Sequence, residues 1–137
     1  MIQNFRYNDR LHLIMEVPDS MLDFFVLHIV LQPLVENSFV HGMAGKAESD
    51  ILALEIRGHE EAGDLVLSVS DNGCGMSKEQ RQNILDEERG SGYGVRNIHH
   101  RFQLVYGEQY GLTYTENEQG GVTVFVRFPK EREEEKI

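Results

Sequence analysis

Alternating apolar and polar residues predict five β-strands along the chain, because successive side chains of a strand point to opposite faces. In the first strand, Leu11 and Leu13 share a face and His12 lies on the other. The polar stretches Gly58–Asp64 and Asn117–Gly121 are expected to join the other four strands into two hairpins. The five predicted strands cover residues 11–17, 52–56, 65–69, 112–115 and 122–128.

A long helix is predicted from Met21 to Val40, where nearly every residue is apolar, and this helix should be buried on most sides. Asp19 and Ser20 precede it as a turn and a helix cap. Pro33 lacks a backbone N–H, so it should kink or restart the helix. We expect the well-formed part to cover about residues 32–42.

Two more helices are predicted in the second half of the chain. Ser77 can cap a short helix that runs to about Asp86. Apolar residues at helical spacing predict another helix over residues 95–106. The segment between them, residues 87–94, is charged and then rich in glycine, so we expect it to be mobile.

The order of these elements predicts an α/β (α+β) two-layer sandwich. One mixed, mostly antiparallel sheet would carry the helices on one face. The chain has 137 residues, a usual length for one domain, which we expect over residues 1–129. Residues 130–137, KEREEEKI, form a charged tail that should fray.

The net charge excludes some partners. At −10 the chain should repel the phosphate backbone of nucleic acid, whereas backbone N–H groups and a metal can still bind a small anion such as a nucleotide. Cys74 is the single cysteine, which suits a reducing, cytoplasmic compartment. No apolar run reaches the roughly 20 residues that span a bilayer, so we expect no membrane contact by this segment.

A first candidate site is LQPLVENSFVHG, residues 31–42. Glu36 and Asn37 are costly inside an apolar helix unless they have partners. Asn37 and His41 share a helical face, and an Asn carbonyl oxygen is a ligand that Mg²⁺ accepts. The alternative is that Glu36 and Asn37 cap local backbone groups or lie on an exposed stripe.

A second candidate site is SVSDNGCGM, residues 68–76. A predicted strand delivers Asp71 into a turn whose glycines let the backbone approach a ligand closely. The fixed carboxylate can accept a hydrogen bond from a flat exocyclic amine such as that of adenine. A plain Asp-Asn-Gly turn is the alternative.

A third candidate site is RGSGYGVRNIHHRF, residues 89–102. Its three glycines precede a helix that starts near Val95, and exposed N–H groups at a helix N-terminus bind phosphate. The spacing matches neither the Rossmann fingerprint nor the Walker loop. A flexible linker explains the glycines about equally well.

The three segments occur in an order that resembles the GHKL superfamily (Bergerat fold), which includes sensor histidine kinases, DNA gyrase, the ninety-kilodalton heat-shock chaperone and MutL. LQPLVENSFVHG looks like the N box, DNGCGM like the G1 box and GSGYGVRNIHHRF like the G2 box. The resemblance covers about residues 8–129. The residues of the motifs are most similar to those in the catalytic ATP-binding domain of LytS/YesM-like histidine kinases.

This resemblance implies ATP and Mg²⁺ as cofactors and assigns the site residues. Asn37 would hold Mg²⁺, Asp71 would contact the adenine amine, and His41 would contact phosphate. Gly92 and Gly94 would form the hinge of a lid beside the phosphates. The nucleotide-binding set is Asn37, Asp71, Gly73, Gly75, Met76, Gly92, Gly94, Val95, Asn97 and Arg101, and the catalytic candidates are Glu36 and His41.

One departure from the superfamily bears on the reaction. Its ATPases place a water-activating Glu four residues before the metal-binding Asn, where this chain has Pro33. Glu36 points about 100° away from Asn37 on a helix, and it could still assist as a base. We therefore expect transfer of the γ-phosphoryl group to a histidine, not hydrolysis.

The resemblance further implies partners. The acceptor histidine would lie in an upstream dimerisation domain, and none of the chain's six histidines has an acceptor context. We expect this segment to bind ATP without phosphorylating itself, and to act with a response regulator and a membrane-anchored parent protein. Two alternatives are a degenerate nucleotide-binding or docking module and a serine kinase of the anti-sigma type, which usually carries the Glu that Pro33 replaces.

Overall fold

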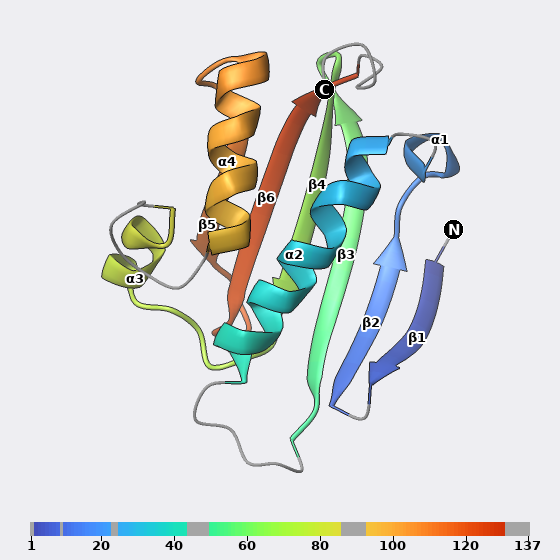
Figure 1. The fold of residues 1–137 in the computed structure, drawn as a ribbon. Coiled ribbons are helices and arrows are strands. Elements are labelled where there is room, and N and C mark those ends of the chain that lie inside the picture. Colours follow the sequence, from blue (N-terminus) through green and yellow to red (C-terminus); the bar gives the residue numbers. More distant parts are fainter. Residues whose placement is uncertain (1, 9, 23–24, 44–49, 86–92, 131–137) are drawn as a thin grey trace.

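One six-stranded sheet forms the centre of the protein, with strand order β1-β2-β3-β4-β6-β5 (Figure 1). The computed structural model describes residues 2–8, 10–22, 25–43, 50–85 and 93–130. The strands are β1 (Ile2–Asn8), β2 (Leu11–Glu16), β3 (Leu52–Glu61), β4 (Asp64–Asp71), β5 (Gly111–Glu116) and β6 (Val122–Pro129). The helices are α1 (Asp19–Leu22), α2 (Phe25–Gly42), α3 (Lys78–Asn83) and α4 (Tyr93–Tyr106).

The sheet is mixed, as predicted. β2 and β3 pair in parallel because α1 and α2 connect them, and the other described strand pairs are antiparallel. β1 was not predicted, because its residues IQNFRYN lack a clean alternation. This segment becomes a strand by pairing with the edge of β2, which is a tertiary effect.

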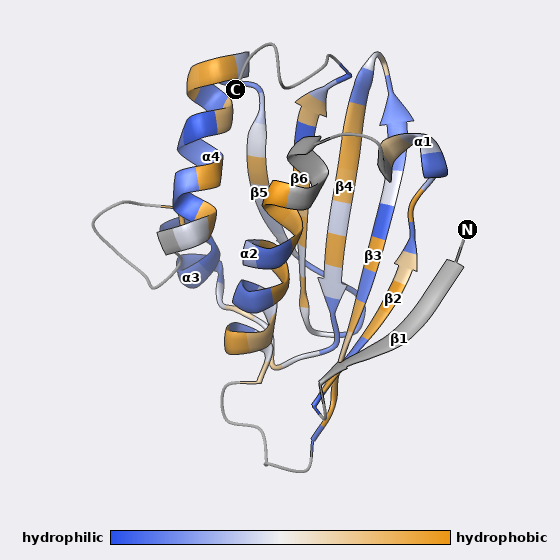
Figure 2. Ribbon diagram, turned by 45° about the vertical axis from the view of Figure 1, so that its right-hand side comes forward, coloured by the Kyte–Doolittle hydropathy of each residue, from blue (hydrophilic) through white to orange (hydrophobic). Residues whose placement is uncertain are grey.

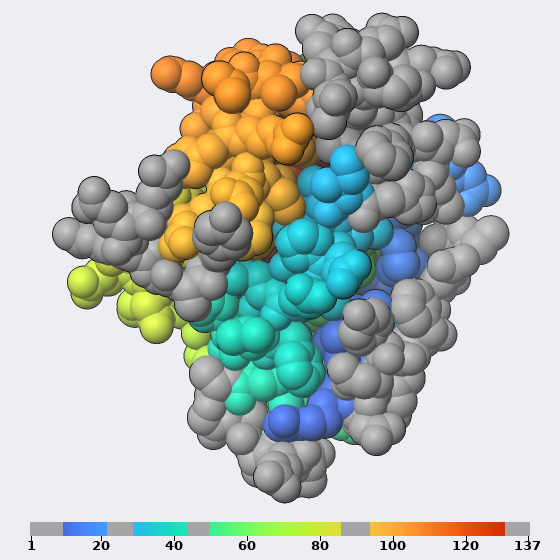
Figure 3. All heavy atoms as spheres, viewed as in Figure 1, coloured from blue at the N-terminus to red at the C-terminus, as the bar shows by residue number. Residues whose placement is uncertain are grey.

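The helices α2 and α4 cover one face of the sheet, which confirms the predicted two-layer arrangement (Figures 1 and 2). Their side chains adjoin in the space-filling view (Figure 3). The core lies between the two layers: Leu54 and Val126 from the sheet and Leu34 from α2 are completely buried. On α4, the ring of Phe102 packs edge to face against the ring of Phe128, with 6.0 Å between the ring centroids.

Pro33 does not restart the helix that contains it. The 18 residues of α2 are continuous, so the predicted division at Pro33 is wrong. The proline removes only the bond to the carbonyl of Ile29, on a side of the helix where Ile29 is 40% exposed. Burial on most sides is also wrong for the described part of α2, because Gln32, Glu36 and Val40 lie on an exposed stripe.

The hairpin between β3 and β4 has a much tighter turn than predicted. Cross-strand pairing continues to Glu61 and Asp64, so the stretch expected as a connection is mostly strand. Ala62 and Gly63 form the turn with φ of 52° and 83°, the left-handed region that a two-residue turn of this kind needs. The second predicted hairpin, β5–β6, is confirmed.

Both predicted later helices are present. Ser77 caps α3: its side chain accepts from the backbone N–H of Gln80, and the Gln80 side chain accepts from the Ser77 N–H. α3 ends at Asn83, earlier than the predicted end near Asp86, and α4 begins at Tyr93, so Tyr93 and Gly94 of the predicted mobile segment are helical. The rest of that segment, residues 87–92, and the tail beyond Lys130 lie outside the described residues.

Candidate functional site

Three elements meet at one edge of the sheet, at the lower side of Figure 1. α2 and β4 end there and β6 begins there, whereas α4 begins higher up, beside Pro33 in the middle of α2. The arrangement brings Gly42 at the end of α2 next to the loop that follows Asp71. Two of the three candidate segments therefore lie in direct contact, and the described part of the third begins against α2 at Pro33.

Asp71 is the buried polar centre of this edge. Its side chain is 3% exposed, and its Oδ1 accepts hydrogen bonds from the backbone N–H groups of Gly73 at 2.9 Å and Val122 at 3.2 Å. Within the described part of the chain no donor reaches Oδ2. Burial raises the pKa of the Asp71 carboxyl, although the two backbone N–H groups counteract this. The carboxylate is thus fixed in direction with one oxygen left for a ligand.

Backbone packs directly against backbone where the loop meets α2. A Cβ added to Gly73 would lie 2.4 Å from the Cα of Gly42, so no larger residue fits without movement. The N–H of Cys74 donates to the carbonyl of Gly42 at 3.1 Å, and the Cys74 thiol donates to the carbonyl of His41 at 3.0 Å. These contacts hold the loop to the C-terminal end of α2.

The turn between β5 and β6 closes the other side of the loop. Gly75 has φ of 81°, and a Cβ there would lie 2.4 Å from the carbonyl oxygen of Gly120. A Cβ on Gly121 would lie 2.2 Å from the carbonyl oxygen of Asp71. The sequence predicted a hairpin turn here, but not that this turn forms part of the site.

Asn117 organises that turn and joins it to Asp71. Its Oδ1 accepts from the N–H groups of Gln119 and Gly121, both at 3.0 Å, and its Nδ2 donates to the Asp71 carbonyl at 2.9 Å. Asn117 was not a candidate, because an Asn in a hairpin turn is common and the partner is 46 residues away.

Asn37 lies on the side of α2 that faces the interior of the protein. Its Oδ1 accepts a hydrogen bond from the hydroxyl of Tyr114 on β5 at 3.0 Å. Burial raises the pKa of the Tyr114 hydroxyl, which is therefore protonated at neutral pH. Tyr114 is the second residue that the sequence analysis missed. Its position in a predicted strand was the only signal.

His41 lies one turn after Asn37 and close to Asp71. Burial lowers the pKa of its imidazole, and the negative charge of Asp71 partly counteracts this. The structure therefore places His41 close to Asp71, one helical turn after Asn37.

Glu36 does not join this group. Its side chain is exposed and accepts a hydrogen bond from Nε2 of Gln32 at 2.9 Å, one turn earlier on the helix. The reason is the helical periodicity, which turns adjacent residues about 100° apart.

The remaining candidates are spread over α4 and the loop. Val95 is 1% exposed and belongs to the core, whereas Asn97 and Arg101 are exposed on α4. A Cβ on Gly94 would lie 3.6 Å from Cβ of Pro33, so α4 begins beside α2. Gly92 lies outside the described residues. The carbonyl of Met76 accepts from Nη1 of Arg81 at 2.7 Å, which ties the loop to α3.

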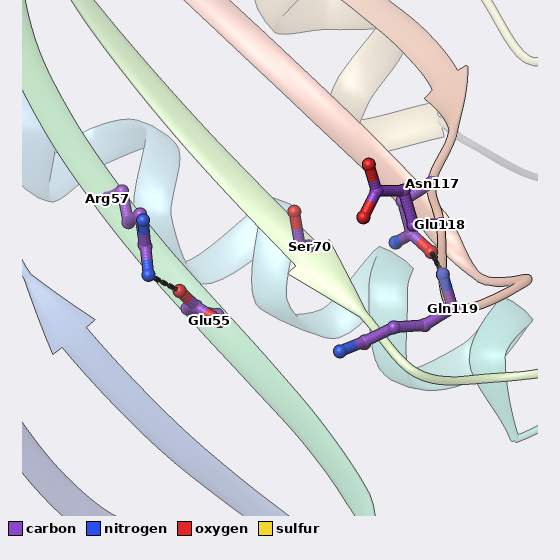
Figure 4. Close-up of a pocket in the computed structure, with 6 residues that line it drawn as sticks. All are labelled: Glu55, Arg57, Ser70, Asn117, Glu118 and Gln119. Carbon is purple, nitrogen blue, oxygen red and sulfur yellow. Dashed lines mark hydrogen bonds and ion pairs between the residues drawn. The ribbon is translucent and has the colours of Figure 1, made fainter.

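A shallow hollow of about 310 Å³ lies on the opposite face of the sheet (Figure 4). Its lining is polar, an ion pair joins Arg57 to Glu55 within it, and the helices lie behind the strands in this view. It is lined by Glu55, Arg57, Ser70, Asn117, Glu118 and Gln119. Asn117, whose Nδ2 donates to the Asp71 carbonyl, also lines this hollow, whereas Asn37 lies on the helix-covered side of the sheet.

Comparison with known proteins decides the family. Residues 23–132 match the family described as "Histidine kinase-, DNA gyrase B-, and HSP90-like ATPase". The chain belongs to this ATPase family. The matched range contains all three candidate segments and every element from α2 to β6.

Curated proteins that resemble the chain include sensor histidine kinases. "Sensor histidine kinase YesM" of Bacillus subtilis is 30% identical over 128 residues, which are 93% of this chain and 21% of that protein. "Sensor histidine kinase/phosphatase LytS" of Staphylococcus aureus is 27% identical over 138 residues, 98% of this chain and 23% of that protein. The chain thus spans about a fifth of the length of these relatives.

A solved structure supports the fold of the ATPase family independently. The ATP-binding domain of PrrB from Mycobacterium tuberculosis superimposes with a TM-score of 0.58 at 19% identity, covering 90% of this chain and 82% of that one. This similarity confirms the fold class that the sequence predicted. No described helix of this chain has the length and apolar character needed to cross a membrane.

Because the chain belongs to an ATPase family, ATP is the nucleotide that the residues at this edge should fit. The glycine contacts leave no room for side chains around Asp71, and Oδ2 of its carboxylate is available to a donor. An amide oxygen has two lone pairs, so Asn37 Oδ1 can accept from Tyr114 and still coordinate a metal. The residues present therefore fit both an adenine nucleotide at Asp71 and a metal ion at Asn37.

Proposed function

We propose that this chain is the ATP-binding catalytic domain of a two-component sensor histidine kinase. Family membership and the two sensor histidine kinases among its relatives support this function. The parent protein would supply a dimerisation domain with the acceptor histidine, a membrane anchor, and contact with a response regulator. The domain itself would work on the cytoplasmic side.

In this proposal, Asp71 Oδ2 accepts a hydrogen bond from the exocyclic amine of adenine. Gly73 and Gly75 would shape the adenine pocket, because each lets backbone of Gly42 or Gly120 pack where a side chain would otherwise lie. The triphosphate would lie towards the start of α4, because the first N–H groups of a helix and the positive end of its dipole attract anions. Gly92 and Gly94 would act as the lid hinge there.

Asn37 Oδ1 would hold Mg²⁺ together with oxygens of the substrate, since this ion commonly takes only one or two protein oxygens. The bound ion would supply positive charge against the charge that develops on the transferred phosphoryl group. His41, half-buried beside Asp71, would contact phosphate. Glu36 would assist as a base only for an acceptor that approaches its exposed side of α2, because it lies away from Asn37. Asn97 and Arg101 would contact the nucleotide from α4.

Pro33 favours phosphoryl transfer over hydrolysis. It occupies the position four residues before Asn37 and lies against the start of α4. A proline side chain has no group that can activate water, so ATP would be held until an acceptor arrives. The observation that carries the proposal is the buried Asp71 carboxylate, fixed through one oxygen at the edge where α2 and β4 end.

The nucleotide assignment is tested by Asp71→Asn, which keeps the Oδ1 acceptor and puts an amide donor in place of Oδ2. We expect at least about a tenfold loss of ATP affinity in titration calorimetry, because an amine would then face a donor. The control Glu55→Gln removes one carboxylate on the opposite sheet face and should bind ATP like the wild type. If Asp71→Asn binds ATP as tightly as the control does, the assignment of Asp71 to the adenine amine is wrong.

The reaction is tested by mixing this chain with the parent protein's dimerisation domain and labelled ATP. Acid-labile label on a histidine supports the kinase function, and this chain alone should take up no label. Label on serine would support the anti-sigma type of kinase. Nucleotide binding without any transfer would support the degenerate module.

A further inference from the structure

The contact between Tyr114 and Asn37 joins an edge strand to the helix that covers the sheet. The two residues are 77 positions apart, and the tyrosine hydroxyl donates to Oδ1 of the asparagine at 3.0 Å. Tyr114 is paired with Val124, which is 1% exposed on the helix-covered face. The tyrosine ring therefore points from β5 under α2, and its hydroxyl ends at the Asn37 amide.

An amide side chain has two different ends. The oxygen accepts hydrogen bonds and binds cations, whereas the nitrogen carries two hydrogens and binds no metal ion. Rotation by half a turn about the last side-chain bond exchanges the two ends with little change in shape. A helix can place the Asn37 side chain at the site, but only a neighbouring group decides which end occupies which position.

The Tyr114 hydroxyl fixes the orientation of the Asn37 amide. Its proton needs an acceptor, since a part-buried hydroxyl without one loses its hydrogen bond to water. Within the described residues, Asn37 Oδ1 is the acceptor. If the amide rotated, its N–H₂ group would face the tyrosine oxygen and the hydroxyl proton would lose this partner. One lone pair of Oδ1 is used in this bond, and the direction of the second lone pair is thereby fixed.

We propose that Tyr114 is a positioning residue for Mg²⁺: its hydroxyl holds the Asn37 amide so that the oxygen, and not the nitrogen, is presented to the metal. The inference rests on the proposed function, in which Asn37 binds the metal. Tyr114 itself would not touch the metal and would act only through Asn37. It assigns a role to a β5 residue that belongs to none of the three candidate segments.

The test is Tyr114→Phe, which keeps the ring and removes only the hydroxyl. ATP affinity is measured by titration calorimetry with Mg²⁺ and with chelator. We expect the gain in affinity that Mg²⁺ gives the wild type to fall about 3- to 10-fold, the range of one neutral hydrogen bond. Affinity in chelator should change less than about twofold, because the adenine contacts are untouched.

The matched control is Tyr110→Phe, which removes a tyrosine hydroxyl that donates to Asp64 Oδ1 at 2.9 Å, next to the β3–β4 turn. It should keep the full gain from Mg²⁺. Urea unfolding of both variants checks that each is folded. A loss of affinity by Tyr114→Phe that is equal with and without Mg²⁺ indicates a structural role and overturns the inference.

Asn37→Ala separates this inference from the proposed function. If Asn37→Ala keeps the full gain from Mg²⁺, the metal assignment itself is wrong. If Asn37→Ala loses the gain while Tyr114→Phe keeps it, Asn37 binds the metal and only the positioning role of Tyr114 is wrong. In support, adding Tyr114→Phe to Asn37→Ala should cause no further loss of the gain, because the amide that the hydroxyl holds is gone.

Discussion

Replacing Gly73 by alanine tests whether the loop after Asp71 is held against α2 as closely as the structure shows. The added Cβ would lie 2.4, 2.6 and 2.8 Å from the Cα, O and C atoms of Gly42. Carbon atoms in proteins approach favourably to roughly 3.5 Å, so the two backbone segments must separate by about 1 Å. Both partners are backbone, and no side chain can rotate out of the way.

The cost has two parts. Overpacking of this kind typically costs about 1–3 kcal/mol. The separation also lengthens the bond from the Cys74 N–H to the Gly42 carbonyl, now 3.1 Å, beyond hydrogen-bond range, which costs about 1 kcal/mol more. With a urea dependence of roughly 2 kcal/mol per molar, the midpoint of unfolding should fall by about 1–2 M. ATP affinity should also fall, because the Gly73 N–H orients the Asp71 carboxylate.

Gly58→Ala is the matched control for this measurement. Its added Cβ would lie 2.9 Å from both Cε and Sδ of Met21, the flexible end of a side chain that can move aside. We expect its unfolding free energy to stay within about 1 kcal/mol of the wild type. If Gly73→Ala unfolds at the same urea concentration as Gly58→Ala, the close contact with Gly42 does not exist in solution and the reasoning is refuted.

Two further predictions concern stability. Burial raises the pKa of Asp71 above 3.8, so its bound proton stabilises the folded state at low pH and this contribution is lost as the pH rises through the raised pKa. Asp71→Asn cannot titrate, and in urea unfolding its stability relative to the wild type should increase as the pH is raised from about 4 to about 6; a constant difference would contradict this. Ser77→Ala removes the cap on Gln80 at 3.1 Å and should weaken α3 by about 0.5–2 kcal/mol. Because no residue of α3 is buried, faster amide hydrogen exchange should appear in α3 alone, and a fall in global stability of the same size would contradict the local role.

The parts of the fold that were predicted correctly follow from local periodicity. The alternation at Leu11 and Leu13 and the apolar spacing of α4 reflect one buried face each, and this information lies within a few neighbouring residues. The strand β1 was missed because its pairing with β2, not its own pattern, makes it a strand. The uninterrupted α2 was missed because packing of its buried side outweighs the single bond lost at Pro33.

For the site, the sequence by itself determined the chemical groups: a carboxylate at a strand end, an amide inside an apolar helix, and glycines where backbone must come close. Only the tertiary structure decided their surroundings. It placed Gly42 against Gly73, Gly121 against Asp71, and the Tyr114 hydroxyl on the Asn37 amide. The physical reason is distance along the chain: these contacts join segments from 31 to 77 residues apart, which local patterns do not encode and which form only when the helices pack on the sheet.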